Sequence, residues 1–526
     1  MHRPLLACCV LSIAAGAAGG VAACSSKSSS GGSSDSGTPD TSTPVDAAEA
    51  GGGGPFLPTI ACADSIASVY QDPGDVSAQP KGAILKCAFD QDMTAAALTA
   101  AAQATDSAGT PPYTGKPFTS GAHVYHVLYR TERGDPANSP GYSSALVLLP
   151  DTPRQGATTP LPVVVASHGS RGQAGPCAPS LLGSAGADVN GDFIHQVYPL
   201  VGFGYAVIAP DLAGYANFGG AGNPPSAYAD SEDVGKSTLD GVAALRNILP
   251  AASLTQQVVI VGHSQGGHTA LSALAISGTY GVKGTISAVA VYSPLWISQH
   301  AWAAIFLEPQ NYGFAESSAG AVSLWYHYTH ATLLDGADSG TDGIFNPTTF
   351  PIVQNFVNTT CWSPSYPALE DAGTSANDFF TTSYVMSIEL PATPAGACSD
   401  ATCTTWIARM TADWPHLTGA AATTPILVVY ANDDTTITPD SMQCVFNRLQ
   451  SDNADYKVCY DTSPVGHSGA VSDNSDYVAD WIAQQTLDGG APTESCTTLA
   501  DNDAGIPQLL DDAGAAIPCN QLLSTQ

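Results

Sequence analysis

Ser264 is the residue of this chain whose surroundings most favour nucleophilic chemistry. It stands at the centre of the pentapeptide GHSQG (residues 262–266), after the β-branched run 258–261 and before an alanine-rich segment with leucines at helical spacing. A strand, a sharp turn and a helix form the context in which a serine is raised above a sheet as a nucleophile. Because the turn is tight, the residues two before and two after the serine must be small. Gly262 and Gly266 meet this requirement, so we predict that Ser264 is a nucleophile.

The partners of such a serine are a base that removes its proton and an acid that orients the base. They are expected beyond later strands, in the chain order serine, acid, histidine. The apolar run 425–430 leads into Asp433 and Asp434, and the run 456–460 leads into a loop of small residues that contains His467. We predict His467 as the base. Asp434, one residue deeper in the turn, is the favoured acid, and Asp433 is the alternative.

The oxyanion that forms when a carbonyl is attacked needs two backbone N–H donors. We predict that Gln265, directly after the nucleophile, supplies one of them. Gly169 or Ser170, in the loop after the apolar run 162–166, supplies the other. Acidic loops at residues 188–192 and 335–338 do not have the full spacing of calcium ligands, so we predict no metal site, and the chemistry requires no organic cofactor.

Strand-like apolar runs alternate with helix-like segments through most of the chain. Residues 122–130 and 144–149 are expected to form leading antiparallel strands. Buried strands at 162–166, 205–209, 258–261, 286–291, 425–430 and 456–460, with helices between them, predict an α/β fold whose mostly parallel sheet is covered on both faces. Residues 294–424 lack this rhythm and are rich in aromatic residues, proline and glycine. A structureless loop of that length does not suit a compact domain, so we predict an inserted cap.

The charge of the chain restricts its partners. Lysine and arginine total 15 against 46 aspartate and glutamate residues, a formal net charge of −31. A nucleic acid or an anionic membrane surface requires a basic face. We therefore predict no nucleic-acid partner, and we interpret the acidity mainly as a source of solubility for an exported protein. The substrate predicted from the residues above is a small-molecule or lipid ester.

The N-terminal segment indicates export. Residues 1–23 combine Arg3 with an apolar, alanine-rich run, as signal peptides do, and Cys24 follows a sequence similar to the processing box of bacterial lipoproteins. We predict lipidation at Cys24, with simple secretory cleavage or an uncleaved anchor as alternatives. Residues 24–55 are Ser, Gly and Asp-rich and are expected to be a disordered tether. These features predict a protein of the bacterial cell envelope, or otherwise a secreted one, that meets the membrane only through its lipid anchor.

The cysteines beyond this segment predict disulfides. Of the 13 cysteines, Cys8, Cys9 and Cys24 lie at the N-terminus, which leaves an even number in an exported chain. Nearness in sequence suggests the pairs Cys62–Cys87, Cys398–Cys403, Cys444–Cys459 and Cys496–Cys519. The two cysteines that remain form the pair Cys177–Cys361, which would join the core to the later insertion. The Cys496–Cys519 pair lies in residues 489–526, a cysteine-containing C-terminal tail.

Together these motifs resemble the secretory lipase family of α/β-hydrolases, of the fungal lipase A type with its bacterial relatives. The resemblance rests on GHSQGG (262–267), HG (168–169) followed by CAPS (177–180), VIAPD (207–211) with Gly214, Asp434 and His467. It implies an α/β-hydrolase core at residues 56–293 and 425–488. It also implies that the cap at 294–424 covers an acyl-binding tunnel. The His-Gly type of oxyanion loop differs from that of the fungal enzymes, which leaves the preferred acyl chain length open.

The function expected from these residues is hydrolysis of carboxylic esters, as a lipase or an esterase, through an acyl-enzyme. Two alternatives come from other classes. One is a serine peptidase on the same fold, and the other is a non-catalytic binding lipoprotein anchored at the cell surface.

Overall fold

The computed structural model describes residues 56–487, except for short gaps, and residues 499–500. The gaps are residues 105–109, 155–159, 183–190, 298, 308–313, 315–317, 337–342, 364, 393–397 and 399. The described residues belong to one compact unit of the chain, residues 52–526. The predicted signal peptide, Cys24 and the tether lie outside the described residues. Among the described residues, no helix is both long enough and apolar enough to cross a membrane.

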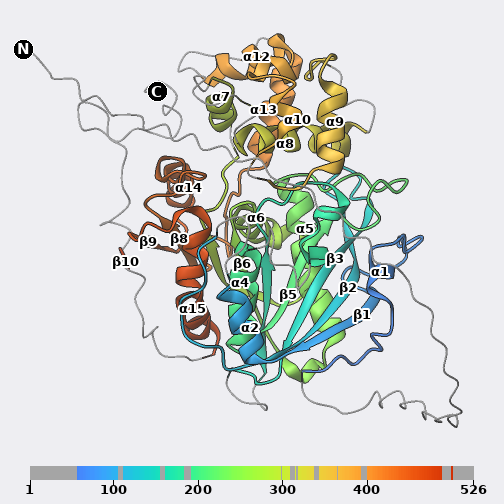
Figure 1. Ribbon diagram of the computed structural model, residues 1–526, viewed down its shortest axis with the longest axis vertical. Coiled ribbons are helices and arrows are strands. Elements are labelled where there is room, and N and C mark those ends of the chain that lie inside the picture. The colour runs from blue at the N-terminus through green and yellow to red at the C-terminus, as the bar shows by residue number, and fades with distance from the viewer. Residues whose placement is uncertain are drawn as a thin grey trace, which may run out of the picture. The chain divides into compact units, whose positions relative to one another are not determined.

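One ten-stranded sheet forms the centre of this unit (Figure 1). Its order is β1-β2-β3-β5-β4-β6-β7-β8-β9-β10. The pairs from β5 through β4 to β9 are parallel, whereas β1, β2, β3 and β10 pair in antiparallel fashion. The strands are β1 (Ile84–Met93), β2 (Ala122–Glu132), β3 (Pro140–Pro150), β4 (Leu161–Ser167), β5 (Ala206–Ala213), β6 (Leu254–His263), β7 (Thr285–Tyr292), β8 (Ile426–Ala431), β9 (Tyr456–Asp461) and β10 (Leu499–Ala500).

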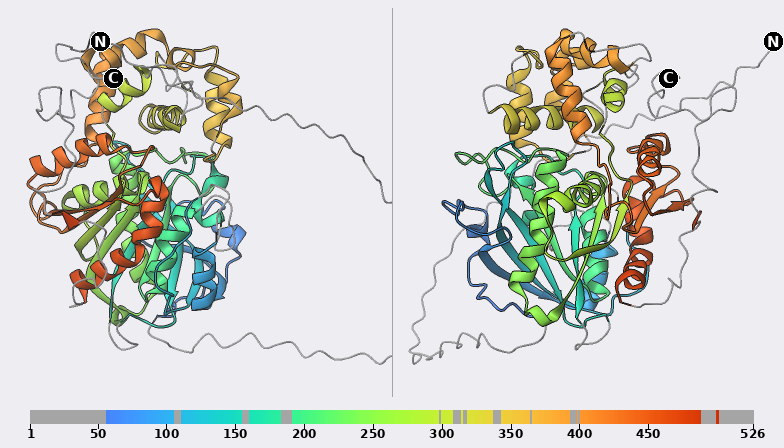
Figure 2. Two further views of the ribbon diagram at one scale, coloured as in Figure 1. Left: turned by 60° about the vertical axis from the view of Figure 1, so that its left-hand side comes forward. Right: turned by 180° about the vertical axis from the view of Figure 1, so that it is seen from behind.

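Helices cover both faces of this sheet, which explains why its central strands are continuous apolar runs (Figure 2). Helices α5 (Ser231–Ile248) and α6 (Gln265–Tyr280) pack together on one face. Helices α2 (Ala95–Ala102), α4 (Gly191–Gly202) and α15 (Gly466–Thr486) pack on the other. The remaining helices of this part are α1 (Ile66–Val69), α3 (Pro179–Leu182) and α14 (Pro439–Ser451). This arrangement confirms the predicted α/β-hydrolase fold class.

The segment between β7 and β8, for which we keep the name cap, is helical in its described parts. Its helices are α7 (Gln299–Leu307), α8 (Ser318–Asp335), α9 (Phe350–Thr359), α10 (Pro367–Glu370), α11 (Ala376–Phe379), α12 (Thr382–Ala392) and α13 (Ala401–Ala412). They enclose most of an aromatic cluster that is separate from the apolar core around the sheet and in which Trp325 stacks on Phe356. Tyr228 and Ala229, just before α5, also belong to this cluster. In Figure 1 the helices of the cap lie above the sheet and its covering helices.

Several elements differ from the expectation. Strand β1 and helix α2, before residue 122, were not predicted. Helix α6 continues past Gly278, which was expected to end it, to Tyr280, and the glycine that takes a positive φ at its end is Gly281, with a φ of 92°. His467, expected in a loop, is the second residue of α15.

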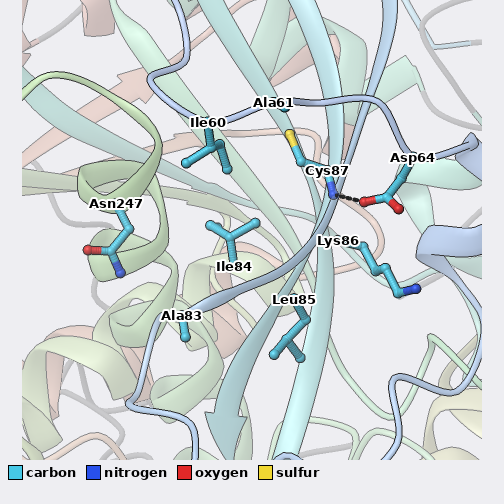
Figure 3. Close-up of a pocket in the computed structure, with 9 residues that line it drawn as sticks. All are labelled: Ile60, Ala61, Asp64, Ala83, Ile84, Leu85, Lys86, Cys87 and Asn247. Carbon is cyan, nitrogen blue, oxygen red and sulfur yellow. Dashed lines mark hydrogen bonds between the residues drawn. The ribbon is translucent and has the colours of Figure 1, made fainter.

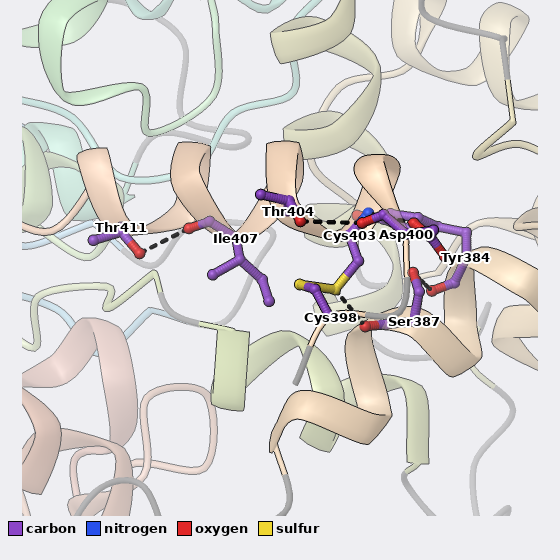
Figure 4. The surroundings of a disulfide bond; sticks show 8 residues. All are labelled: Tyr384, Ser387, Cys398, Asp400, Cys403, Thr404, Ile407 and Thr411. Carbon is purple, nitrogen blue, oxygen red and sulfur yellow. Dashed lines mark hydrogen bonds between the residues drawn. A yellow bond between two sulfur atoms is a disulfide. The ribbon is translucent and has the colours of Figure 1, made fainter. Parts of the chain in front are cut away.

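Three of the expected disulfides are present: Cys62–Cys87, Cys177–Cys361 and Cys398–Cys403. The last closes the turn before α13, where the carboxylate of Asp400 also accepts the Cys403 N–H at 2.8 Å (Figure 4). Cys444 and Cys459 each form a disulfide as well. The predicted bond between these two cysteines is not among the disulfides found within the described residues. The Cys496–Cys519 pair lies outside them.

Candidate active site

Ser264 occupies a strained turn between β6 and α6. Its φ is 54° and its ψ is −117°, a conformation that side-chain-bearing residues rarely adopt. A Cβ on Gly262 would overlap the carbonyl oxygen of Gly266 and lie 2.8 Å from the nitrogen of Gly267. A Cβ on Gly266 would overlap the carbonyl oxygen of Ser167 and lie 2.7 Å from that of His168. The turn therefore exists only because both glycines lack side chains.

Neighbouring strands hold this turn in place. The Ser264 N–H donates to Tyr292 O at the end of β7 (2.9 Å), and the Ser264 carbonyl accepts the Leu295 N–H (2.9 Å). The same carbonyl accepts the N–H groups of Gly267 and His268, which starts helix α6. The strain at Ser264 is thus fixed by hydrogen bonds on both sides of the residue.

His467 and Asp434 meet beyond the ends of β8 and β9. His467 Nδ1 lies 2.8 Å from Asp434 Oδ2. The other oxygen of Asp434 accepts the N–H groups of Thr436 (2.8 Å) and Ile437 (2.9 Å). Asp433, the alternative acid, accepts the N–H of Gly466 at 2.9 Å instead. Of the two adjacent carboxylates, it is therefore Asp434 that orients the imidazole.

The surroundings keep Asp434 ionised. Burial alone favours its neutral form, but the hydrogen bond and charge of His467, followed by the Ile437 N–H, outweigh burial and hold the pKa of Asp434 below its usual range. An ionised carboxylate at Nδ1 requires that this nitrogen carry a proton. The lone pair of a neutral His467 then lies on Nε2, where a base needs it.

His263 connects the turn to this pair. Its ring lies 4.4 Å from the ring of His467, measured between centroids, so the residue directly before Ser264 packs against the predicted base. Burial, and then the charge of His467, keep the pKa of His263 well below its ordinary value. A neutral His263 allows His467 to become protonated without facing a second cation on that side.

The predicted oxyanion donors border the same turn. Gln265 is the first residue of α6, and N–H groups in the first turn of a helix have no partner within the helix. Gly169 and Ser170 follow β4, and the contacts of Gly266 with Ser167 and His168 bring this loop directly beside the turn. The Ser170 hydroxyl lies 2.6 Å from Tyr228 Oη. The group of Ser170 that could serve as an oxyanion donor is therefore its backbone N–H.

The loop after β4 is also fastened to the cap. The Cys177–Cys361 disulfide joins the two, and the Trp362 N–H donates to Arg171 O at 2.9 Å. Gly172, at a φ of +86°, allows a close approach, because a Cβ there would lie 2.5 Å from Thr360 O. The candidate oxyanion loop and the end of α9 therefore form one connected structure.

Asp211 is a supporting residue to which the sequence reasoning gave no role. It is fully buried, and its carboxylate accepts Ser144 Oγ (2.6 Å), the Ser180 N–H (2.8 Å) and Ser180 Oγ. Asp211 belongs to the motif VIAPD and Ser180 to the motif CAPS. The presence of both motifs is the sequence signal that could have pointed to these two residues. The bond between them fixes the far end of the oxyanion loop to β5.

Two other features lie apart from this site. A pocket of about 410 Å³ is bordered by the Cys62–Cys87 disulfide and by residues of β1 and α5, and it shares no residue with the site (Figure 3). Among the described residues, one group has the spacing of metal ligands, namely Asp230, His330 and Asp413, and it also uses none of the residues above.

Comparison with known proteins agrees with this architecture. No curated protein sequence matches the chain. Candida antarctica lipase A in its closed state has a similar structure, with a TM-score of 0.58 and 15% identity over 87% of this chain and 92% of that one. The rice cell wall degrading esterase LipA from Xanthomonas oryzae gives a TM-score of 0.55 and 18% identity over 78% of this chain and 99% of that one. Such identities speak for the fold alone. A model of the alpha/beta hydrolase family matches residues 163–481, a stretch that contains Ser264, Asp434 and His467, and the protein belongs to this family.

Proposed function

We propose that this protein hydrolyses carboxylic esters through an acyl-enzyme formed on Ser264. The observation that carries the proposal is the strained serine between two obligatory glycines: its neighbour His263 packs against a histidine whose Nδ1 is held by a buried carboxylate. A strained backbone costs on the order of 1–3 kcal/mol, and such strain is concentrated at functional sites.

In the first half of the reaction, His467 Nε2 removes the proton of Ser264 Oγ as this oxygen attacks the ester carbonyl. The C–O bond to the leaving alcohol then breaks, and the alcohol takes the proton from His467. In the second half, His467 activates a water molecule in the same way, and the water releases the carboxylic acid and restores Ser264. Asp434 keeps His467 in the required tautomer throughout.

The tetrahedral oxyanion is stabilised by the N–H of Gln265 and by that of Gly169 or Ser170. The position of Gln265 at the N-terminus of α6 supports its role, because the helix dipole favours negative charge there. Each such donor typically contributes about 10²–10³-fold to kcat.

The substrate class is an ester with an apolar acyl group. The aromatic cluster of the cap supports this choice, as do the names of the similar structures, a lipase and an esterase. Hydrolysis of a series of p-nitrophenyl esters from acetate to palmitate would define the preferred chain length.

The test of the mechanism compares Ser264→Ala with Ser277→Ala. Ser277 lies near the other end of the same helix, where its hydroxyl donates to Leu274 O. We expect ester hydrolysis and labelling by a fluorophosphonate probe to be lost in the first variant and retained in the second. Esterase activity that survives in Ser264→Ala would contradict the proposal, and cleavage of peptide substrates without ester cleavage would favour a peptidase.

We also propose that the protein is exported and lipidated at Cys24, with residues 56–293 and 425–488 as the catalytic core and residues 294–424 as its cap. The three disulfides support export, because such bonds persist in oxidising compartments. Metabolic labelling with a fatty acid should mark the wild-type protein but not Cys24→Ser.

A further inference from the structure

Three buried side chains from distant parts of the sequence converge between the core and the cap. Asp230 is the N-cap residue of α5, His330 lies in α8, and Asp413 directly follows α13. His330 Nε2 lies 3.0 Å from Asp413 Oδ2 and 3.6 Å from Asp230 Oδ2. One donor atom from each residue falls within 4.8 Å of the other two.

The histidine directs its Nε2 at the two acids. His330 Nδ1 lies 2.8 Å from Tyr326 O, and since a carbonyl only accepts hydrogen bonds, Nδ1 carries a proton. The other nitrogen, Nε2, shares a hydrogen bond with Asp413 Oδ2 at 3.0 Å, and a metal ion bound there would displace the shared proton. Metal-bound histidines commonly have this arrangement, with the second nitrogen donating to a backbone carbonyl.

Backbone N–H groups hold both carboxylates by their Oδ1 atoms. Asp413 Oδ1 accepts the Ser231 N–H at 3.0 Å, and Asp230 Oδ1 accepts the Asp233 N–H at 2.8 Å. These bonds leave the Oδ2 atom of each acid directed at His330.

The positive charge that faces the two acids is that of His330 itself: burial lowers the pKa of this imidazole, but Asp413 and then Asp230 raise it by more. Within the described part of the chain, neither Asp230 nor Asp413 forms an ion pair with a lysine or an arginine. Tyr326 Oη donates to Asp413 Oδ2 at 2.7 Å, which supplies a hydrogen bond but no charge. Two buried carboxylates that share one imidazole are costly, and a divalent cation bound to all three side chains would supply more positive charge than the single imidazolium does.

We propose that Asp230, His330 and Asp413 bind one divalent transition-metal ion, Zn²⁺ by preference, which joins the cap to the core. Ligands at tetrahedral angles on zinc lie about 3.4 Å apart, and the two measured separations of 3.0 and 3.6 Å bracket this value. One imidazole nitrogen with two carboxylates suits zinc better than calcium or magnesium, which take oxygen ligands. A water molecule completes the fourth position. The ion is structural, since the site shares no residue with the Ser264 site.

The experiment uses the purified full-length protein, stripped with a chelator and then titrated with Zn²⁺. We expect one tightly bound zinc per chain by elemental analysis and a melting temperature that rises with the Zn²⁺ concentration. Asp230→Asn retains an acceptor for the Asp233 N–H and so preserves the helix cap, but it removes an anionic ligand. This variant and His330→Gln should each weaken zinc binding by at least roughly 100-fold.

The matched control is His416→Gln. His416 also contacts a buried carboxylate, Asp452, at 2.7 Å, but it faces only this one and is largely exposed. Zinc binding should be unchanged in this variant. A wild-type protein that retains no zinc and gains no thermal stability from it would overturn the proposal and leave an imidazolium between two acids. Unchanged binding in Asp230→Asn and His330→Gln would also overturn it. If these variants do not fold, the absorption spectrum of Co²⁺ bound to the wild-type protein decides, because one nitrogen and three oxygen ligands give a tetrahedral spectrum.

Discussion

Replacement of Gly266 by alanine tests whether the turn at Ser264 and the loop after β4 must touch. The new Cβ would lie 2.7 Å from His168 O, about 0.7 Å inside the 3.4 Å at which ordinary contact begins, and the carbonyl oxygen of Ser167 is closer still. Neither backbone atom can rotate away, so the turn and the loop must separate. A displacement of about 1 Å in a reacting geometry costs about 10²-fold in rate, equivalent to about 2.7 kcal/mol in the barrier.

We therefore expect Gly266→Ala to lower kcat for p-nitrophenyl ester hydrolysis by about 10²-fold or more, with a smaller change in KM. Overpacking should also reduce the free energy of unfolding, measured in urea, by about 1–3 kcal/mol. Gly278→Ala is the control in the same helix, because nothing lies within 4 Å of its Cβ. It should keep full activity and gain up to about 1 kcal/mol of stability. Wild-type kcat and stability in Gly266→Ala would refute the reasoning.

Three further changes give distinct outcomes. Asp434→Asn should lower kcat by about 10⁴-fold because it favours the wrong tautomer of the histidine, whereas Asp433→Asn should stay within about tenfold of wild type; equal losses in steady-state assays would be inconsistent with these roles. Replacement of both Cys177 and Cys361 by serine should lower the free energy of unfolding by about 2–5 kcal/mol and should also reduce kcat. A urea titration that gave the wild-type free energy of unfolding would contradict this expectation. Burial raises the pKa of Asp240 to about 6, so the folded state holds a proton that the unfolded state loses near pH 4, and stability falls as pH rises from 4 to 7. Relative to Asp240→Asn, the wild-type unfolding free energy should fall by on the order of 3 kcal/mol over this range, and parallel pH profiles of the two proteins would disprove it.

The central strands and the turn at Ser264 could be predicted because their signals are local. A parallel strand buried on both faces must be apolar throughout, and β4 is buried along its whole length. Strand β1 was missed because it carries polar residues at the sheet edge and its pairing with β2 shifts register twice. No regular alternation marks such a strand.

The cap gave no helical signal for a different reason. Helix α8 is buried on nearly all sides from Gly320 to Ala331, so it has no polar face whose period could be read. The choice between Asp433 and Asp434 depends on a single residue step in a turn, which only the hydrogen bonds to Gly466 and His467 distinguish.

The proposed metal ligands were also beyond the reach of the sequence, from which no metal site was expected. Asp230, His330 and Asp413 are far apart along the chain and form no motif with a recognisable spacing. Only the packing of α8 and the end of α13 against the start of α5 brings them together.

The covalent link between Cys177 and Cys361 restricts how a substrate could be admitted. If Gly169 or Ser170 is an oxyanion donor as proposed, a lid that swung away on this side would move their loop with it and separate the two proposed donors. An opening motion that keeps the site intact would therefore leave the part of the cap near Cys361 in place. The part of the cap farther from this disulfide would move.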